Sequence, residues 1–260
     1  MENKIGLVLS GGGVRGVAHV GVLKVLEEVG IKISHLSGAS AGSIVGALYA
    51  AGHSPDTILE FFKKTSIFSI SNYAIFKPGI IDTSKLIAVF KKYLEDDSYE
   101  SLQKKLYIVA TDIENAQSKI FSEGPVIQTI LASSAFPMVF TPVNIDGILY
   151  SDGGIMNNFP IEPLEGVCDK IIGVYVNPID TVKKNDLNSS LSIMQRAYHL
   201  SIGASSLRKY ELFDVLIAPR GLSKYDTFSM SHIDEIYEIG YEAAQSHRSV
   251  LEKLLTESTP

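Results

Sequence analysis

The sequence predicts an α/β fold in which a mostly parallel, partly mixed sheet carries helices on both faces. Short apolar runs with the length of buried strands alternate with segments whose apolar residues recur at helical spacing. The dipeptide Asp146-Gly147 separates two short apolar runs, which predicts one antiparallel hairpin within this alternation. No internal repeat or linker interrupts the pattern, so we expect a single domain over residues 1–260.

Local signals place the individual elements. The apolar run 5–9 ends in glycines, as a buried strand does, and the helical spacing that follows stops at Gly30. Ser54, Pro55 and Asp56 form a helix start, with a capping serine, a proline in the first turn and an acid just inside. The predicted strands are 5–9, 31–37, 106–110, 119–121, 143–145, 148–150, 171–176 and 214–217. The predicted helices are 14–29, 43–51, one that opens at 54, 82–94, 126–135, 191–207 and 233–255, and 183–190 is expected to be an exposed loop.

Composition and charge narrow the partners. Hydrophobic residues make up 45% of the chain, which is ample for a packed core, and the net charge is −6. The acidic balance argues against nucleic acid and against electrostatic docking on anionic lipid, so any membrane contact would be apolar. No apolar run approaches the ~20 residues of a spanning helix, and residues 1–4 lack a signal-peptide pattern. We therefore expect a cytoplasmic protein, with peripheral contact to the inner face of the membrane left open.

The sequence indicates no metal site and no cofactor. Cys168 is the single cysteine, which excludes an internal disulfide, and no Cys/His cluster has zinc spacing. Because Cys168 comes just before an apolar run, we interpret it as a structural thiol.

The pentapeptide Gly38-Ala39-Ser40-Ala41-Gly42 lies between a predicted strand and a predicted helix. A Gly-x-Ser-x-Gly elbow at such a junction holds its serine in a strained conformation and exposes it above the sheet edge. The N-terminus of the following helix favours negative charge there, as acyl transfer requires. A tight turn packed on a sheet would give the same pattern without chemistry, so the pentapeptide alone leaves both interpretations open.

The glycine-rich segment Gly11-Gly12-Gly13-Val14-Arg15-Gly16 joins the first predicted strand to the first helix. A dinucleotide fingerprint fits its spacing but lacks an acid at the end of the next strand, and a phosphate loop would need lysine after the last glycine. An oxyanion hole, in which freed backbone N–H groups face a ligand, is the interpretation that we favour over a plain turn. Arg15 lies near the N-terminus of the first predicted helix, where the helix dipole disfavours a positive charge. We therefore expect Arg15 to pair with a carboxylate or to contact a charged group of the substrate.

A third motif, Ser151-Asp152-Gly153-Gly154, follows the hairpin. Asp152 ends an apolar strand and the two glycines turn the chain away, so its carboxylate could lie partly desolvated beside a hydroxyl. A turn aspartate that bonds its own backbone is the other interpretation.

In their order along the chain, the glycine loop, the Ser40 elbow and the Asp152 turn resemble the patatin-like phospholipase family. Residues 132–137 (Ala-Ser-Ser-Ala-Phe-Pro) and 157–160 (Asn-Asn-Phe-Pro) are also similar to that family, and the resemblance extends from Gly6 to about Val176. In size and in its first forty residues the chain is similar to short bacterial members related to neuropathy target esterase.

This resemblance implies a three-layer sandwich and a metal-free acyl hydrolase that cleaves lipid esters with a serine–aspartate dyad. Ser40 would be the nucleophile and Asp152 the proton acceptor, with N–H groups around Gly12 and Gly13 and that of Ala41 holding the oxyanion. Burial of Asp152 would raise its pKa and make it a better base for an alcohol.

A serine–histidine–acid triad is the rival mechanism, because three histidines follow Asp152 along the chain. His232, near a helix start, is the leading candidate, whereas His199 and His247 lie within predicted helices. His19 could line the site or merely pack. Two further histidines, His35 and His53, are expected at the surface.

The irregular apolar stretch 67–81 could cap an acyl-chain channel, face lipid or pack in the core. Two function classes remain open: a serine acyl hydrolase acting on lipid esters, and a non-catalytic protein that binds an acyl or phosphate group at the same glycine-lined site. The sequence does not indicate an oligomeric state.

Overall fold

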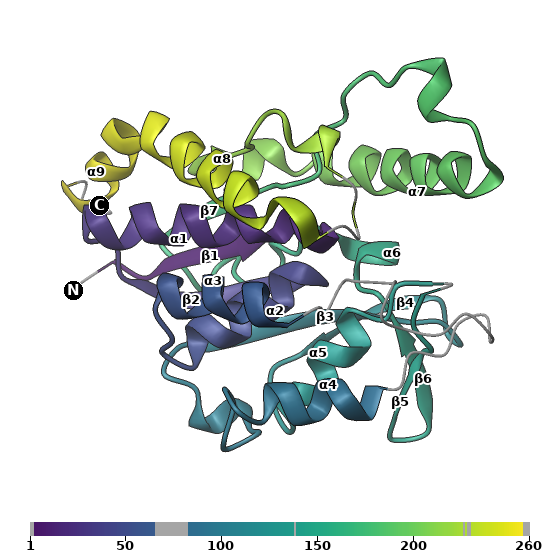
Figure 1. The fold of residues 1–260 in the computed structure, drawn as a ribbon. Helices are drawn as coiled ribbons and strands as arrows, with labels where there is room; N and C mark the ends of the chain where they lie inside the picture. The colour runs from purple at the N-terminus through teal and green to yellow at the C-terminus, as the bar shows by residue number, and fades with distance from the viewer. Residues whose placement is uncertain (1–2, 66–82, 138, 226, 228–229, 257–260) are drawn as a thin grey trace.

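The computed structural model describes residues 3–65, 83–137, 139–225, 227 and 230–256. They form an eight-stranded sheet in the order β5-β6-β3-β2-β1-β7-β8, with β4 beside β3 (Figure 1). The strands are β1 (Ile5–Leu9), β2 (Ile33–Ala39), β3 (Lys105–Asp112), β4 (Gln117–Phe121), β5 (Val143–Ile145), β6 (Ile148–Ser151), β7 (Lys170–Val174) and β8 (Val215–Ile217). The helices are α1 (Val17–Val29), α2 (Ala41–Ala50), α3 (Pro55–Lys64), α4 (Thr83–Phe90), α5 (Val126–Ser133), α6 (Gly154–Asn157), α7 (Ser190–Leu207), α8 (Ile233–Ser246) and α9 (Arg248–Thr256).

The sheet is parallel at its centre and mixed at one end, which confirms the predicted α/β class. β8, β7, β1, β2 and β3 are parallel neighbours, whereas β4 and β6 run antiparallel to β3 and β5 runs antiparallel to β6. The predicted hairpin turn is present, and both Asp146 and Gly147 have positive φ. This is the conformation of a type I′ turn, one of the two favoured two-residue hairpin loops.

The pairing of β3 explains how two distant segments of the chain meet. Ile108 and Val109 pair with both β2 and β4. Thr111 and Asp112 pair with both β6 and β4. Because a strand has only two edges, β2 and β6 share one edge of β3 and β4 occupies the other. β2 is parallel and β6 antiparallel to β3, so they run toward each other and their chains leave the sheet beside Ala110.

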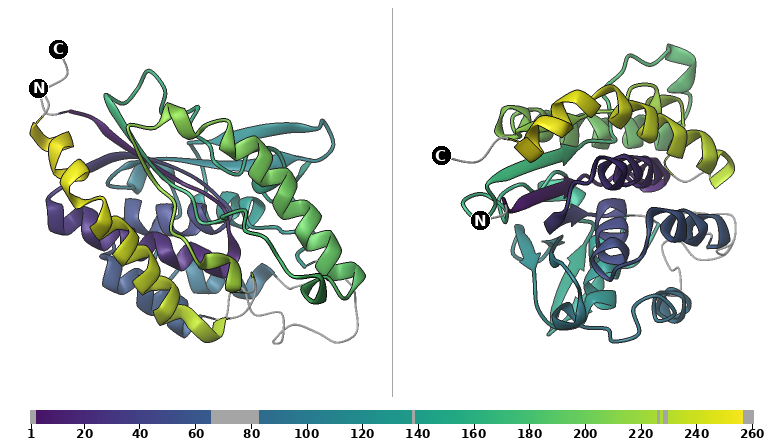
Figure 2. Two further views of the ribbon diagram at one scale, coloured as in Figure 1. Left: turned by 90° about the horizontal axis from the view of Figure 1, so that it is seen from above. Right: turned by 90° about the vertical axis from the view of Figure 1, so that its left-hand side faces the viewer.

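The two faces of the sheet are covered differently (Figures 1 and 2). Leu7 and Leu9 of β1 belong to the larger core, which joins the sheet to α1, α2, α3, α5 and α8. Val8 faces the opposite side, where a smaller core includes Phe159 and other residues of an irregular segment. Helix α7 approaches this side near Tyr175, so helices lie on both faces but the second layer is mostly irregular chain.

Three predicted helices differ most in their bounds. The helix predicted at 14–29 begins with a 3-10 turn over Gly13–Gly16, and the one predicted at 82–94 ends at Phe90. The prediction of a single helix over 233–255 is wrong, because the helix is interrupted at His247 and divides into α8 and α9. The Ser246 hydroxyl and His247 Nδ1 both bond the Ala243 carbonyl, at 2.6 and 2.8 Å. Such side-chain bonds compete with the helical backbone ladder.

Among the described helices, none combines the length and the hydropathy needed to cross a bilayer. The apolar stretch 67–81, interpreted from the sequence as a cap, a lipid-facing patch or a core segment, lies outside the described residues.

The end of α1 at Gly30 supplies a test of the fold. Gly30 has φ 87° in the left-handed region, and a Cβ there would meet no atom within 4 Å. We expect Gly30→Ala to lower the free energy of unfolding by about 1 kcal/mol through backbone strain alone. Gly30→Asn, which tolerates this conformation, should cost less. Urea unfolding of both variants measures the difference, and equal losses would contradict the strain explanation.

Candidate active site

Ser40 stands at the turn between β2 and α2. Its backbone has φ 50° and ψ −122°, outside the regions that a serine ordinarily occupies. Glycines on either side make this turn possible. A Cβ at Gly38 would lie 2.6 Å from the Gly42 carbonyl carbon, and one at Gly42 would lie 2.1 Å from the Leu9 carbonyl oxygen. The structure therefore has the strand–turn–helix geometry predicted for the pentapeptide.

Three serines hold the backbone of Ser40. The Ser40 N–H donates to Ser133 Oγ at 2.9 Å, and Ser133 Oγ in turn donates to the Val109 carbonyl at 2.6 Å. The Ser40 carbonyl accepts from Ser43 Oγ at 2.6 Å and from Ser134 Oγ at 3.4 Å. These bonds offset the strained conformation and fix the direction of the Ser40 side chain.

Asp152 follows directly after β6, and Ser40 follows directly after β2. Because β2 and β6 run toward each other along one edge of β3, the two residues meet there. Its N–H donates to the Ala135 carbonyl at 3.1 Å, and its own carbonyl accepts from Thr111 Oγ1 at 2.9 Å. The Ser40 hydroxyl donates to Asp152 Oδ2 at 2.7 Å, and the Gly154 N–H donates to Oδ1 at 2.7 Å. Serine and carboxylate are therefore in direct contact although 112 positions separate them in sequence.

The Asp152 carboxyl is withdrawn from water. Burial raises its pKa from 3.8 to about 6, although the hydrogen bonds from Ser40 and Gly154 act in the opposite direction. Burial and the charge of Asp152 together raise the pKa of the Tyr198 hydroxyl above its usual value. Gly153 lets the chain pass close to β3, because a Cβ there would lie 2.1 Å from the Val109 carbonyl oxygen.

The glycine loop lies beside Ser40 and is anchored at both ends. The Gly11 N–H donates to the Asn158 carbonyl at 3.1 Å, and the Val14 N–H donates to the Thr227 carbonyl at 2.9 Å. Between these anchors, Gly12 and Gly13 line the pocket that contains Ser40. Gly13 has φ 58°, and a Cβ there would overlap Thr227, so glycine is required at this position.

Arg15 and Gly16 support the loop from outside the pocket lining. The Arg15 guanidinium is buried and donates through Nε and Nη2 to the Tyr225 carbonyl, at 3.1 and 2.9 Å. Arg15 thus ties the loop to the segment before α8, and it is not among the described residues that line the pocket. Gly16 allows close packing, since a Cβ there would lie 2.5 Å from the Ala41 Cβ.

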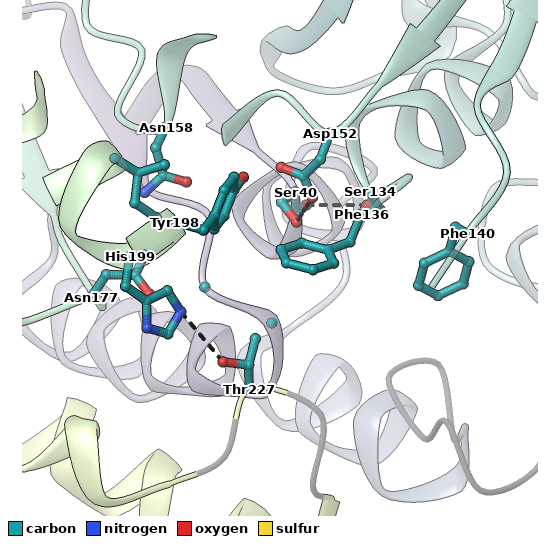
Figure 3. Close-up of a pocket in the computed structure, with 13 residues that line it drawn as sticks. Ser40, Ser134, Phe136, Phe140, Asp152, Asn158, Asn177, Tyr198, His199 and Thr227 are labelled. Atoms are coloured by element: carbon teal, nitrogen blue, oxygen red, sulfur yellow. Dashed lines mark hydrogen bonds between the residues drawn. The ribbon is translucent and has the colours of Figure 1, made fainter. Parts of the chain in front are cut away.

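The pocket separates polar from apolar side chains (Figure 3). In this view Asn158, Asn177 and His199 lie on one side of Ser40, and the phenylalanines at 136 and 140 lie on the other. The cavity measures about 30 Å³, which exceeds the roughly 10–15 Å³ that one water molecule needs by the same measure.

The histidines considered for the rival triad differ in their position relative to the pocket. His232 lies outside the pocket lining, is half exposed and bonds Glu235 at 2.9 Å, so it is not placed to act as a base for Ser40. His199, by contrast, lines the pocket, with Nε2 3.5 Å from Thr227 Oγ1. The Ser40 hydroxyl nevertheless bonds Asp152 directly.

His19 packs beneath the glycine loop. It is fully buried, and its Nε2 contacts the Ser10 carbonyl at 2.8 Å. Burial lowers the pKa of His19 to about 4, so the ring is neutral at neutral pH. The two histidines expected at the surface, His35 and His53, are partly buried, and each makes a hydrogen bond.

Several pocket residues escaped the sequence analysis or appeared in it without a role. Ser134 and Asn158 stood in segments singled out only for their resemblance to a family. Asn177 follows the carboxyl end of a predicted strand, which is where ligands of such sheets bind. This position could have identified Asn177 as a candidate pocket residue. Tyr198 gave no signal, and His199 was only a minor candidate for the rival triad, because a helical segment does not reveal which of its faces will line a pocket.

No group of three or more potential metal-binding side chains occurs within the described part of the chain. Cys168 is half-buried, and burial raises the pKa of its thiol to about 11. This agrees with a structural rather than a reactive thiol.

A family model described as patatin-like phospholipase matches residues 7–165, which is more than half of the chain. The chain belongs to the patatin-like phospholipase family. This confirms the resemblance noted in the sequence, and the match includes the glycine loop, Ser40 and Asp152.

Curated members of the family extend the comparison. An uncharacterized NTE family protein of Mycobacterium tuberculosis is 34% identical over 178 residues, which cover 67% of this chain and 49% of that protein. Lysophospholipase nte1 of Neosartorya fischeri is 27% identical over 98% of this chain, and human patatin-like phospholipase domain-containing protein 6 is 26% identical over the same share. The chain covers 18% and 21% of these two proteins and about half of the mycobacterial one.

Solved structures share the patatin-like fold. VipD from Legionella pneumophila aligns with a TM-score of 0.62 at 16% identity, over 98% of this chain and 67% of its own. Human GIVD cytosolic phospholipase A2, in complex with methyl gamma-linolenyl fluorophosphonate, aligns with a TM-score of 0.55 at 11% identity, over 98% and 58%.

The buried carboxyl gives a stability test. The pKa of Asp152 is higher in the folded state, so its contribution to stability is complete below pH 3.8 and is lost as pH rises through about 6. We expect Asp152→Asn to raise the free energy of unfolding by about 3 kcal/mol at pH 8, and by less than about 1 kcal/mol at pH 4. Urea unfolding at several pH values measures this gain. Asp96→Asn, at an exposed position, is the control, and a pH-independent difference for Asp152→Asn would contradict burial as the cause.

Proposed function

We propose that this protein is a serine acyl hydrolase that cleaves lipid carboxylic esters, with Ser40 as nucleophile and Asp152 as proton acceptor. The observation that carries the proposal is the 2.7 Å hydrogen bond from Ser40 Oγ to Asp152 Oδ2 at a strained elbow. Membership of the patatin-like phospholipase family supports the reaction class. The name lysophospholipase, carried by a relative, supports a lipid ester as substrate.

The proposed reaction has two steps, acylation of Ser40 and hydrolysis of the acyl-serine. Ser40 Oγ attacks the ester carbonyl carbon while its proton passes to Asp152, and a tetrahedral oxyanion forms. The carbon–oxygen bond to the alcohol breaks, and the leaving alkoxide takes the proton from Asp152, which leaves an acyl-serine. Water then attacks the acyl carbon and gives its proton to Asp152, and Ser40 recovers that proton as the fatty acid departs.

Burial makes the aspartate a usable base. A pKa of about 6 instead of 3.8 brings the pKa of Asp152 about two units closer to that of the serine hydroxyl. This lowers the free-energy cost of the proton transfer by roughly 3 kcal/mol. The backbone N–H groups of Gly12, Gly13 and Ala41 would stabilise the oxyanion, and one such donor contributes roughly 3 kcal/mol. Gly12 and Gly13 line the pocket with Ser40, and Ala41 begins α2, whose N-terminus favours negative charge.

Two alternatives make different demands. A serine–histidine–acid triad would need an imidazole on Ser40, and His199 belongs to the pocket lining whereas His232 does not. A non-catalytic acyl- or phosphate-binding protein would not need a strained serine bonded to a buried carboxylate. Peripheral contact with a membrane and a cytoplasmic location stay predictions from the sequence.

Side-chain substitutions distinguish these mechanisms. We expect Ser40→Ala and Asp152→Asn each to lower kcat for a medium-chain ester by at least about a thousandfold, because each removes one half of the proton transfer. His232→Ala should keep most of the activity. A fluorophosphonate probe should label the wild type at Ser40 and leave Ser40→Ala unlabelled. An active Asp152→Asn protein would overturn the dyad, and an unlabelled wild type would favour the non-catalytic alternative.

The pH dependence of kcat/KM identifies the base. Protonated Asp152 cannot accept a proton, so kcat/KM should fall about tenfold per unit below a pH of about 6 and level off above it. The same fall in kcat/KM below a pH of about 6 should persist in the His199→Ala variant, whatever the overall rate of that variant. Loss of this fall in His199→Ala would assign the titrating group to the imidazole.

A further inference from the structure

Two buried amides in the pocket have hydrogen-bonding atoms that no described residue satisfies. Asn158 Nδ2 and Asn177 Oδ1 are both withdrawn from solvent, and neither has a hydrogen-bond partner. The two side chains belong to residues that are 3% and 4% exposed, and both line the pocket that contains Ser40. An unpaired buried polar atom costs about 1–3 kcal/mol, so this pair is expected to have a ligand.

The other polar atom of each amide lies close to neighbouring groups of the site. Asn177 Nδ2 donates to the Gly11 carbonyl, which leaves Asn177 Oδ1 as the unused acceptor. Around Gly154, Asn158 Oδ1, Asp152 Oδ1 and the Tyr198 hydroxyl all lie within 2.9 Å of the point where a Cβ would stand. Asn158 Oδ1 thus lies on the side of Tyr198 and Asp152, and Asn158 Nδ2 has no hydrogen-bond partner among the described residues.

The unused atoms form one donor and one acceptor on the same side of Ser40. A hydroxyl group matches such a pair, because it accepts one hydrogen bond and donates another. The opposite wall is apolar, with Phe136 in edge contact with Tyr198 and with Phe140 beyond it (Figure 3). No lysine or arginine is among the described residues that line the pocket, so the lining offers a phosphate no cation.

We propose that Asn158 and Asn177 bind a free hydroxyl on the leaving alcohol of the substrate, next to the scissile ester, while the acyl chain lies toward Phe136 and Phe140. This rests on the proposed ester hydrolysis and adds the class of alcohol: a polyol such as glycerol in preference to a simple alkanol. Monoacylglycerols and lysophospholipids both carry such a hydroxyl. Asn158 is a specificity-determining residue in this arrangement.

Binding can be measured without any chemistry. We would titrate the Ser40→Ala protein by calorimetry with 1-O-octylglycerol, an ether that cannot be hydrolysed, and with octyl propyl ether, which lacks both hydroxyls. We expect about tenfold tighter binding of the glycerol ether, and a preference below about threefold when Asn158→Ala is added. Equal affinities for the two ethers in the Ser40→Ala protein would overturn the proposal. The octyl ether of glycerophosphocholine, titrated in parallel, separates a lysophospholipid from a neutral glycerolipid as the source of the hydroxyl.

Kinetics separate recognition of the alcohol from general damage. Asn158→Ala should lower kcat/KM for 1-octanoylglycerol about tenfold or more, and that for propyl octanoate less than about threefold. Asn188→Ala, at an exposed position outside the pocket lining, should change neither. Equal losses for both esters would overturn the proposal and place Asn158 among the groups that act on the shared acyl carbon. Absence of any Ser40-dependent hydrolysis would refute the proposed function, while the ether titrations would still decide the hydroxyl site.

Discussion

The site depends on one constraint of the sheet, namely that β2 and β6 share an edge of β3 and run toward each other. The last residue of β2 pairs with Val109 and the last residue of β6 pairs with Thr111, so the next residue of each chain falls beside Ala110. Those next residues are Ser40 and Asp152. The contact between hydroxyl and carboxylate is therefore set by strand register rather than by a loop. A slip of one residue in either pairing would turn that strand's side chains to the other face.

Around this contact the fold maintains two unfavourable features, a strained serine and a buried carboxylate. The end of α5 holds the backbone at both places. Ser133 binds the Ser40 N–H through its hydroxyl and the Gly153 N–H through its carbonyl, while the Ala135 carbonyl accepts from Asp152. One short segment thus bonds to both halves of the site, because its hydroxyl and carbonyl groups bind the backbone of Ser40, Asp152 and Gly153.

The elements that place the site could be predicted from the sequence because their signals are local. The glycines around Ser40 and the turn at Asp146-Gly147 each require one backbone conformation whatever surrounds them. The polar wall of the pocket could not be predicted in this way. Tyr198 and His199 reach the pocket because α7 packs beside α6, and the sequence of α7 does not state which of its faces does so. The break at His247 was missed for a related reason, since the His247 ring takes the Ala243 carbonyl that the His247 N–H would bond in a continuous helix.

The anchoring of the glycine loop reaches beyond the part of the chain that the family model covers, which ends at residue 165. Arg15 and the Val14 N–H are held by the carbonyls of Tyr225 and Thr227, both contributed by the stretch that leads into α8. A fragment trimmed to the matched region would keep Ser40 and Asp152 but lose the two carbonyls that anchor the glycine loop. The smallest unit that keeps this loop anchored therefore extends into the C-terminal third, and chimeras between family members should exchange that third together with the glycine loop.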